Sequence, residues 1–460
     1  MQGLVDMIIS FSNWLWGTPM LLILAGGSLF LTIKLGFFQF KYFPFAMKET
    51  FGKIFKKAEG EGTVSPFQAA TAALASTIGA SNIVGVPVAI AFGGPGAIFW
   101  MWVIALLATA AKFSEIVLGM KYREKNIEGD YVGGPMYFLS KGIKGPLGKA
   151  LGSIFAFFLM IELIPSIATQ AVSAVQTAST INIPNIVTGA FLVILVGLVV
   201  FGGIKRITNV TEKLVPIMAL LYIGAGLAII FVNITELPAA FGLIFKYAFT
   251  PMAATGGIAG STLALALRWG TARGVYSNEA GMGTAPIAHA AAVTDHPARQ
   301  ALWGIFEIVV DTLIVCTITA LVILVSGVWE IVPSDQAATM PAVAFQQLFG
   351  ETLGGGIVTI SILLFVLSTI IVITYYGKTQ AEFLFGTKFS NVMVGVYLLS
   401  IILGVYGGIE FLYNFLDILL ATIIIPNMIG LIVLSGEIKD LKDEFFGNPK
   451  YYPKAKIKGE

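Results

Sequence analysis

The chain has 460 residues, of which 57% are hydrophobic and 12% are charged, and its mean hydropathy is +0.86. A soluble domain of this length does not reach that hydropathy, so most of the chain must face lipid or other helices. The net charge of +2 gives no case for nucleic acid as a partner. One cysteine excludes a disulfide framework, and two histidines are too few for a histidine-rich metal site.

The hydropathy pattern predicts an all-α integral membrane protein. A window of about 20 residues, the length that crosses a bilayer as a helix, finds eleven transmembrane helices with soft boundaries. The N-terminal segment lacks a basic region and a small-residue cleavage site, so we expect it to be retained. The eleven predicted spans are 14–36, 66–92, 96–120, 150–176, 184–203, 209–232, 261–291, 299–326, 354–386, 391–407 and 410–436.

The basic residues between the spans predict the orientation. Most of them fall in segments that the predicted spans place on one side of the bilayer, namely 41–57, 121–149, 205–213, 378–388 and the tail after 439. Because positively charged loops stay in the cytoplasm, that side is predicted to be cytoplasmic. The N-terminus is then outside and the C-terminus inside a multi-pass protein of the cell membrane.

Four segments are predicted not to span. Residues 37–65 mix aromatic residues and lysines, as an interfacial helix on the cytoplasmic side would. Residues 233–260 and 328–353 form the two longest external connections, and both resemble short re-entrant or surface helices. The C-terminal segment 437–460 is a basic, solvated cytoplasmic tail.

The second span is interrupted where it crosses the middle of the bilayer. At about 1.5 Å per helical residue, the sequence Ile78–Asn82 lies near the midplane of span 66–92. Close helix packing is one interpretation of these small residues. Pro87 favours the other, because glycine and proline together weaken a helix, and a glycine-interrupted span marks the binding site of many transporters.

The seventh span carries a second interruption. Span 261–291 holds four glycines, a proline and the charges Arg268, Arg273 and Glu279, and charges at this depth usually face a bundle interior or a water-filled cavity. The two broken spans are five apart. If 1–36 is an additional N-terminal helix, then 66–232 and 261–436 form two five-helix repeats of opposite orientation. Such a five-plus-five inverted repeat offers a binding site between its broken helices.

Four motifs resemble a known family. They are GGPGAIFWMWVIALLA at 93–108, KFSEIVLGMKYR at 112–123, GGPMYF at 133–138 and SNEAGMGTAPIAHAAA at 277–292. The chain is similar over nearly its whole length to the alanine or glycine:cation symporters, the sodium:alanine symporters of the amino acid, polyamine and organocation superfamily. Ala108 stands where the first motif usually ends in glycine. The resemblance implies the leucine-transporter fold and sodium-coupled symport of small neutral amino acids, alanine and glycine, through alternating access.

The predicted geometry of the second span assigns a substrate site. Its first half ends near Ile78 with free carbonyls, which suit a cation, and its second half begins near Ser81 with free N–H groups, which suit a carboxylate. An amino acid zwitterion satisfies both ends. The predicted substrate-binding residues are Thr77, Gly79, Ala80, Ser81 and Asn82, with Gln170 on the fourth span and Gly270, Thr271, Gly274, Ser277 and Asn278 on the seventh.

The resemblance also implies a sodium site. In the leucine-transporter fold one sodium ion lies between carbonyls of the first core helix and hydroxyls of the eighth, and these positions correspond here to Ala75, Ile78, Phe365, Ser368 and Thr369. Carbonyl and hydroxyl oxygens are ligands that suit such a hard cation. The alternative for the two hydroxyls is a bond to their own helix. A second sodium near Asn82, touching Asp311, is the weaker hypothesis.

Other function classes have less support in the sequence. A membrane-embedded enzyme would need a convergent acid, base or metal set, and His289 and His296 lack a helical metal spacing. A channel usually repeats its pore by oligomeric symmetry, although the sequence leaves the oligomeric state open. A proton-coupled carrier is the main alternative, because Glu162, Glu279, Glu307 and Asp311 could titrate. Lys112 and Glu115, three residues apart, are predicted either to pair locally or to form a cytoplasmic gate with other spans.

Overall fold

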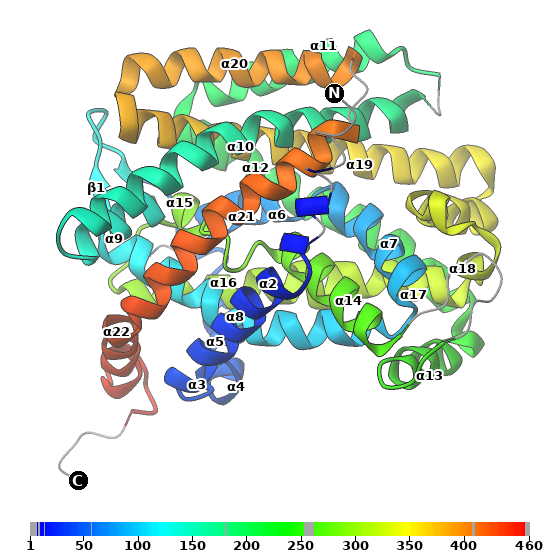
Figure 1. The fold of residues 1–460 in the computed structure, drawn as a ribbon, viewed down its shortest axis with the longest axis horizontal. Coiled ribbons are helices and arrows are strands. Elements are labelled where there is room, and N and C mark those ends of the chain that lie inside the picture. Colours follow the sequence, from blue (N-terminus) through cyan, green and yellow to red (C-terminus); the bar gives the residue numbers. More distant parts are fainter. Residues whose placement is uncertain are drawn as a thin grey trace.

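The computed structural model describes residues 7, 10–12, 14–56, 58–179, 182–252, 262–406 and 410–455. In this part of the chain the fold is mostly helical, and the long helices run roughly along the longest axis of the molecule (Figure 1). Among the described residues, seven helices are long and apolar enough to cross a membrane, or eight if one bent pair counts as a span, and two shorter apolar helices are Thr18–Lys34 and Asn185–Val200. The predicted number of eleven stays a prediction, as does the inverted repeat.

The first half of the chain contains the first broken span and the long helices at 97–121, 146–179 and 203–232. Its elements are α2 (Thr18–Leu21), the π-helix Leu22–Gly26, α3 (Gly27–Lys34), α4 (Phe38–Lys41), α5 (Phe43–Phe51), α6 (Pro66–Thr77), the π-helix Ser81–Gly85, α7 (Val86–Gly93), α8 (Ala97–Lys121), β1 (Glu124–Lys125), β2 (Tyr131–Val132), α9 (Pro135–Gly142), α10 (Pro146–Ser179), α11 (Asn185–Val200) and α12 (Gly203–Val232).

The second half begins with short helices, contains the second broken span and ends in a helix outside the bundle. Its elements are the 3-10 helix Ile234–Glu236, α13 (Leu237–Tyr247), α14 (Leu263–Asn278), α15 (Ala285–His289), α16 (Pro297–Ile308), the π-helix Val309–Cys316, α17 (Thr317–Val325), α18 (Val328–Ile331), the 3-10 helix Ser334–Thr339, α19 (Met340–Phe385), α20 (Thr387–Tyr406), α21 (Glu410–Val433) and α22 (Ser435–Gly447).

The predicted break in the second span is confirmed. Helix α6 starts at a capping box between Ser65 and Gln68, with Pro66 in its first turn, where the missing N–H costs nothing. It stops at Ile78, whose backbone angles of −76° and 86° are not helical. The chain resumes at Ser81, and the two pieces are bent by 49°. The second span is therefore two half-helices.

The seventh predicted span is also broken, and the structure locates the break. Helix α14 ends at Asn278, and Glu279 follows in the left-handed region with φ of 54°. Gly281 and Gly283 have φ of 91° and 81°, values that only glycine adopts without strain. The chain becomes helical again at Ala285. Of the four glycines in this span, only Gly281 and Gly283 make the break.

Some elements differ from the prediction. The all-α prediction omitted the two-stranded antiparallel hairpin β1–β2. Helix α19 is divided by Gly350, whose φ of 80° separates a short helix in the predicted connection 328–353 from the membrane helix. Helices α4 and α5 occupy the predicted interfacial segment and α13 the predicted connection 233–260, whose residues 253–260 lie outside the described part.

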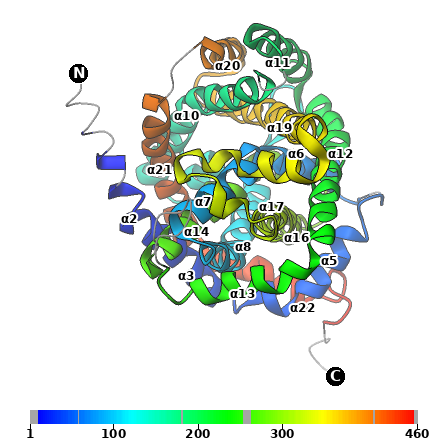
Figure 2. The ribbon, with the colours of Figure 1, turned by 90° about the vertical axis from the view of Figure 1, so that its right-hand side faces the viewer.

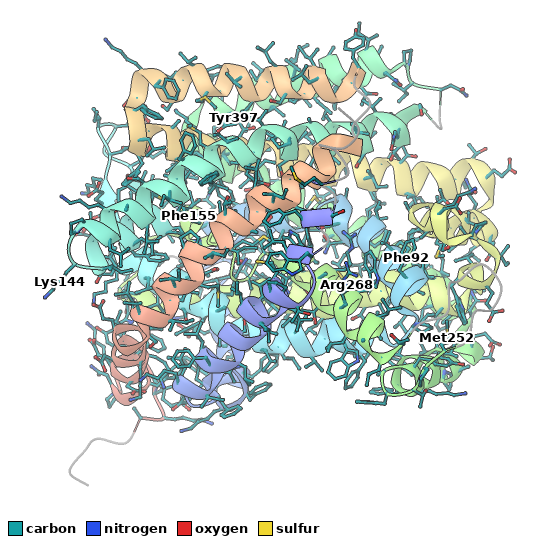
Figure 3. The ribbon with its side chains drawn as sticks, in the orientation of Figure 1. Phe92, Lys144, Phe155, Met252, Arg268 and Tyr397 are labelled. Atoms are coloured by element: carbon teal, nitrogen blue, oxygen red, sulfur yellow. The ribbon has the colours of Figure 1, made fainter. Side chains whose placement is uncertain are left out.

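The two broken helices lie inside the bundle. Helix α6 packs against α12, α19, α15 and α16, and Figure 2 shows it in the middle of the ring of helices. Helices α11, α12 and α20 expose large apolar side chains such as Ile194, Leu220 and Leu403, which suits contact with lipid. Lys144 and Met252, from predicted connections of opposite sides, lie at opposite ends of the molecule (Figure 3).

Candidate functional site

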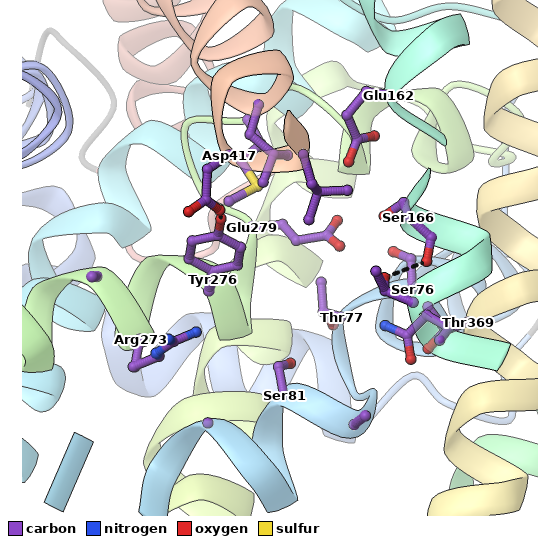
Figure 4. Close-up of a pocket in the computed structure, with 18 of the residues that line it drawn as sticks. Ser76, Thr77, Ser81, Glu162, Ser166, Arg273, Tyr276, Glu279, Thr369 and Asp417 are labelled. Carbon is purple, nitrogen blue, oxygen red and sulfur yellow. Dashed lines mark hydrogen bonds between the residues drawn. The ribbon is translucent and has the colours of Figure 1, made fainter. Parts of the chain in front are cut away.

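A cavity of about 570 Å³ lies between the two broken helices. Helices α10, α19 and α21 complete its wall, and Figure 4 shows the side chains that reach into it. Its polar lining includes hydroxyl groups, one amide, three carboxylates and two guanidinium groups. A cavity with both signs of charge can hold a zwitterion, which an apolar cavity would exclude.

Some predicted site residues line this cavity and others do not. Thr77, Ala80, Ser81, Gln170 and Thr369 are part of the lining. Gly79 lies just behind it, since a Cβ built on Gly79 would be 3.0 Å from Thr369 Oγ1 and 3.6 Å from Gln170 Nε2. The structure therefore brings the first break, the fourth span and the ninth span together at one cavity.

The first break leaves main-chain N–H groups at the cavity wall. Gly79 N donates to Asn82 Oδ1 at 3.0 Å, and Asn82 N donates to Gly79 O at 3.3 Å. The N–H groups of Ala80 and Ser81 have no acceptor within hydrogen-bonding distance among the described residues. They open the second half-helix, where the backbone favours an anion.

Asn82 does not face the cavity but sits in a fully buried network. Its Nδ2 donates to Asp311 Oδ1 at 2.7 Å and to Ser277 Oγ at 3.0 Å. The Ser277 hydroxyl donates to Asp311 Oδ2 at 2.6 Å, and the Thr312 hydroxyl donates to the same oxygen at 2.8 Å. The network ties the first broken helix to α14 and to the π-helix Val309–Cys316. Asn278, predicted beside Ser277, is also buried and outside the lining.

The predicted glycines of the seventh span face the neighbouring helix rather than the cavity. A Cβ on Gly270 would be 2.2 Å from the carbonyl oxygen of Ala97, and one on Gly274 would be 2.7 Å from the Cγ2 of Ile104. Their spacing of four residues lets α14 approach α8 closely, as small residues do in membrane helices. Thr271 is also outside the cavity lining. Ala272, on another face of α14, lines the cavity instead.

The residues of the predicted sodium site are close together. Thr369 Oγ1 lies 3.0 Å and Ser368 Oγ 3.5 Å from the carbonyl oxygen of Ala75. Ser368 also donates to its own helix, at 2.9 Å from the carbonyl oxygen of Phe365. Ile78 ends α6 one turn further on. These oxygens are of the kind that a sodium ion requires, and the Thr369 hydroxyl faces another helix rather than its own.

Several polar cavity residues were not predicted as site residues. Asp417 on α21 accepts a hydrogen bond from the Tyr276 hydroxyl, and its carbonyl oxygen accepts one from Trp16 Nε1 at 2.7 Å. Arg273 lies beside Trp269 and Tyr276. The signal that could have found both positions is a charge within a predicted span, Arg273 in 261–291 and Asp417 in 410–436.

Lys112 and Glu115 bind other elements rather than each other. Lys112 Nζ donates to the carbonyl oxygen of Asn278 at 2.9 Å and lies 3.3 Å from Glu307 Oε2. Glu115 Oε1 accepts from Gly283 N at 3.0 Å and from Asn427 Nδ2 at 2.6 Å. Both side chains therefore hold the break of the seventh span. The local pairing that their spacing allowed is not among the ion pairs of the described residues.

Comparison with known proteins identifies the family. Over residues 1–458 the sequence matches the model of the sodium:alanine symporter family. It is 52% identical to the uncharacterized transporter YflA of Bacillus subtilis, covering 99% of this chain and 96% of that protein. It is 42% identical to the sodium/alanine symporter AgcS of Methanococcus maripaludis, covering 94% and 95%.

A solved structure supports the fold. The crystal structure of MhsT in complex with L-phenylalanine superimposes with a TM-score of 0.61 at 12% sequence identity, covering 81% of this chain and 89% of that one. At that identity the similarity concerns the fold alone, which is that of the leucine-transporter type. Together with the apolar helices, the match over nearly the whole chain shows a multi-pass membrane transporter and not an enzyme. The chain belongs to the sodium:alanine symporter family.

Proposed function

We propose that the protein imports small neutral amino acids, alanine and glycine, by sodium-coupled symport. The observation that carries this proposal is the first break, where free N–H groups face the cavity beside a cluster of carbonyl and hydroxyl oxygens. AgcS, a relative with sodium and alanine in its name, supports the choice of ion and substrate. Alternating access would expose the cavity first outside and then to the cytoplasm, with the basic connection 121–149 on the cytoplasmic side.

The sodium ion in this proposal binds between α6 and α19. Its ligands are the carbonyl oxygens of Ala75, Ile78 and Phe365 and the hydroxyls of Ser368 and Thr369. Ala75, Phe365 and both hydroxyl residues are buried, so a bound cation would exchange water for fixed oxygens. The contact of Thr369 with Ala75 joins two helices, and sodium binding there would hold α6 against α19.

The substrate lies next to this ion in the cavity. Its carboxylate accepts from the N–H groups of Ala80 and Ser81, and its ammonium group faces the carbonyl end of α6 near Thr77. Gln170, whose Oε1 has no partner among the described residues, lines the cavity beside Gly79 and can accept from the ammonium group. Both charged ends of the ligand are then used at the first break, so the side chain alone is left for selection.

A second sodium at the Asn82 network is the weaker part of the proposal. Asp311 supplies a full charge there, with the oxygens of Ser277 and Thr312 beside it. The same carboxylate makes proton coupling the alternative to sodium coupling. The two alternatives predict different responses to imposed gradients.

Transport into liposomes tests the proposal. Purified protein should accumulate labelled alanine when a sodium gradient is imposed, and should not when only a pH gradient is imposed. Unlabelled glycine should compete well and glutamate or lysine poorly, because both charged ends of the substrate are already bound at the first break and a third charge would have to be desolvated in addition. Accumulation driven by the pH gradient alone would reject sodium coupling, and equal competition by glutamate would reject the substrate class.

A further inference from the structure

A buried histidine beside the second break belongs to a hydrogen-bonded series of residues. His289, the last residue of α15, is fully buried and lies between two residues of α16. Its Nε2 is hydrogen-bonded to Glu307, and its Nδ1 lies 2.9 Å from Gln300 Nε2. The same Gln300 Nε2 also donates to the carbonyl oxygen of Pro66 at 3.3 Å. This series therefore connects α15 and α16 to the first residue of α6.

This arrangement fits only the neutral histidine. An amide nitrogen is a donor only, so Nδ1 of His289 must accept from Gln300 and cannot carry a hydrogen. The hydrogen then resides on Nε2, which donates to the Glu307 carboxylate. Both ring nitrogens of a charged histidine are donors. A proton on Nδ1 would point at the Gln300 nitrogen, and two donors would face each other.

Gln300 has an unused acceptor that would relieve this conflict. Its Oε1 is buried and has no hydrogen-bond partner among the described residues. Rotating the amide by half a turn would bring Oε1 to the protonated Nδ1, but would take Nε2 away from the carbonyl of Pro66. The chain before α6 is paired with the chain after α15 through the bridges Glu61–Thr294 and Val64–Ala292, so Pro66 lies at the end of this pairing.

The charged groups around His289 come from several elements. Glu307 on α16 contacts it directly, and Lys112 on α8 lies 3.3 Å from the other oxygen of Glu307. Glu115 on α8 holds Gly283 just before α15, and Arg123 donates to the carbonyl oxygens of Ala290 and Ala292 just after it. The neighbouring α6 contributes no titratable side chain, and α19 brings tyrosines, Tyr375 and Tyr376, together with Lys378 and Glu382.

We propose that His289 is a proton-binding site that controls the start of α6. The neutral histidine keeps Gln300 bound to Pro66 and holds the first half-helix against α16. The charged histidine turns the Gln300 amide and releases that contact, so α6 separates from α15 and α16 more readily. The proton acts on the contact between Gln300 and Pro66 and is not the coupling ion, so the inference does not depend on which cation drives transport.

The chain has two histidines, so a substitution of His296 serves as the control for a substitution of His289. In H289Q the new amide can accept from Gln300 and donate to Glu307 but cannot gain a charge at neutral or mildly acidic pH. In H296N the cap of α16 is kept, because asparagine also accepts from the helix N-terminus, and only the other histidine is removed. Uptake is measured at equal pH on both sides of the liposome membrane, under one fixed driving gradient.

We expect the wild-type uptake rate to change by about two- to tenfold between about pH 5 and 8, which is the size expected for one buried hydrogen bond. H296N should keep this profile and H289Q should lose it. A pH profile that H289Q retains would overturn the proposal. If H289Q does not fold, Q300L is used instead, because it removes the contact with Pro66 at every pH and should give a flat profile.

A labelling experiment measures the separation of α6 from its neighbours and does not require transport. Ala69 on α6 is fully buried, so a cysteine placed there should react with a polar thiol reagent only when α6 separates from its neighbours. Labelling is compared at each pH between the A69C protein and the A69C/H289Q protein, so that the pH dependence of the thiol itself cancels. Faster labelling of A69C alone at about pH 5.5 is expected, and equal rates in both proteins would reject the proposal. The assay needs neither sodium nor substrate, so its failure is separable from failure of the symport proposal.

Discussion

Replacing Thr369 by valine tests the sodium site most directly. Valine has nearly the shape of threonine, so the buried position stays filled and only the hydroxyl is lost. That hydroxyl lies 3.0 Å from the carbonyl oxygen of Ala75, on a different helix. Removing one partner from a buried polar group costs about 1–3 kcal/mol. Because about 1.4 kcal/mol corresponds to tenfold in affinity, the sodium concentration for half-maximal uptake should rise by about 5- to 150-fold.

The same helix supplies a matched control. Thr374 is also fully buried on α19, but its hydroxyl donates only to the carbonyl oxygen of Ile370, four residues back on its own helix. T374V therefore removes a hydroxyl of the same kind without touching α6. Alanine uptake into liposomes is titrated with sodium for both variants. The assignment is wrong if T369V keeps the wild-type sodium dependence, or if T374V shifts it as much.

Three further predictions concern the two breaks. Ser81→Pro removes a main-chain N–H and should lower alanine affinity by about tenfold or more, whereas Ser81→Ala should lower it less; equal effects in a binding assay would contradict a backbone carboxylate site. A cysteine at Ala272 should react with a polar thiol reagent and be protected by alanine, whereas one at Gly274 should not react; the reverse pattern would move the cavity. Gly283→Ala should reduce the yield of folded protein, because its φ is 81° and the added Cβ would lie 2.5 Å from the Cγ of Pro135; wild-type yield and melting temperature would refute this.

The breaks themselves could be predicted from the sequence because their causes are local. Ile78–Asn82 combines glycine with small polar residues inside an apolar span, and the helix does end at Ile78. The seventh span contains enough glycine to predict a break, but four glycines in one helix do not say which of them makes it. That depends on φ, and φ is positive at Gly281 and Gly283 only because the chain turns there toward α15.

The candidate site was likewise only partly predictable from the sequence. Thr77, Ala80 and Ser81, predicted as substrate-binding residues, line the cavity because they lie at the break itself. Gly270 and Gly274 were predicted as site residues and Ala272 was not, yet the two glycines face α8 while Ala272 faces the cavity. Which face of a helix lines a cavity is set by its rotation against its neighbours. In α14 the glycines and the arginines lie on different faces, and only the packed structure shows that the face with Arg268, Ala272 and Arg273 lines the cavity.

The partners of the buried charges were decided by tertiary structure alone. The sequence by itself determined that Lys112, Glu115 and Glu307 lie inside the membrane and therefore need partners, because an unpaired charge is costly there. It could not tell that Lys112 reaches the carbonyl of Asn278, 166 residues away, or that Glu307 binds His289. The hydropathy of a segment is a local property, so it indicates the depth of each residue in the membrane from the sequence. A contact between two side chains depends on how two segments pack, and that packing is decided only when the whole bundle assembles.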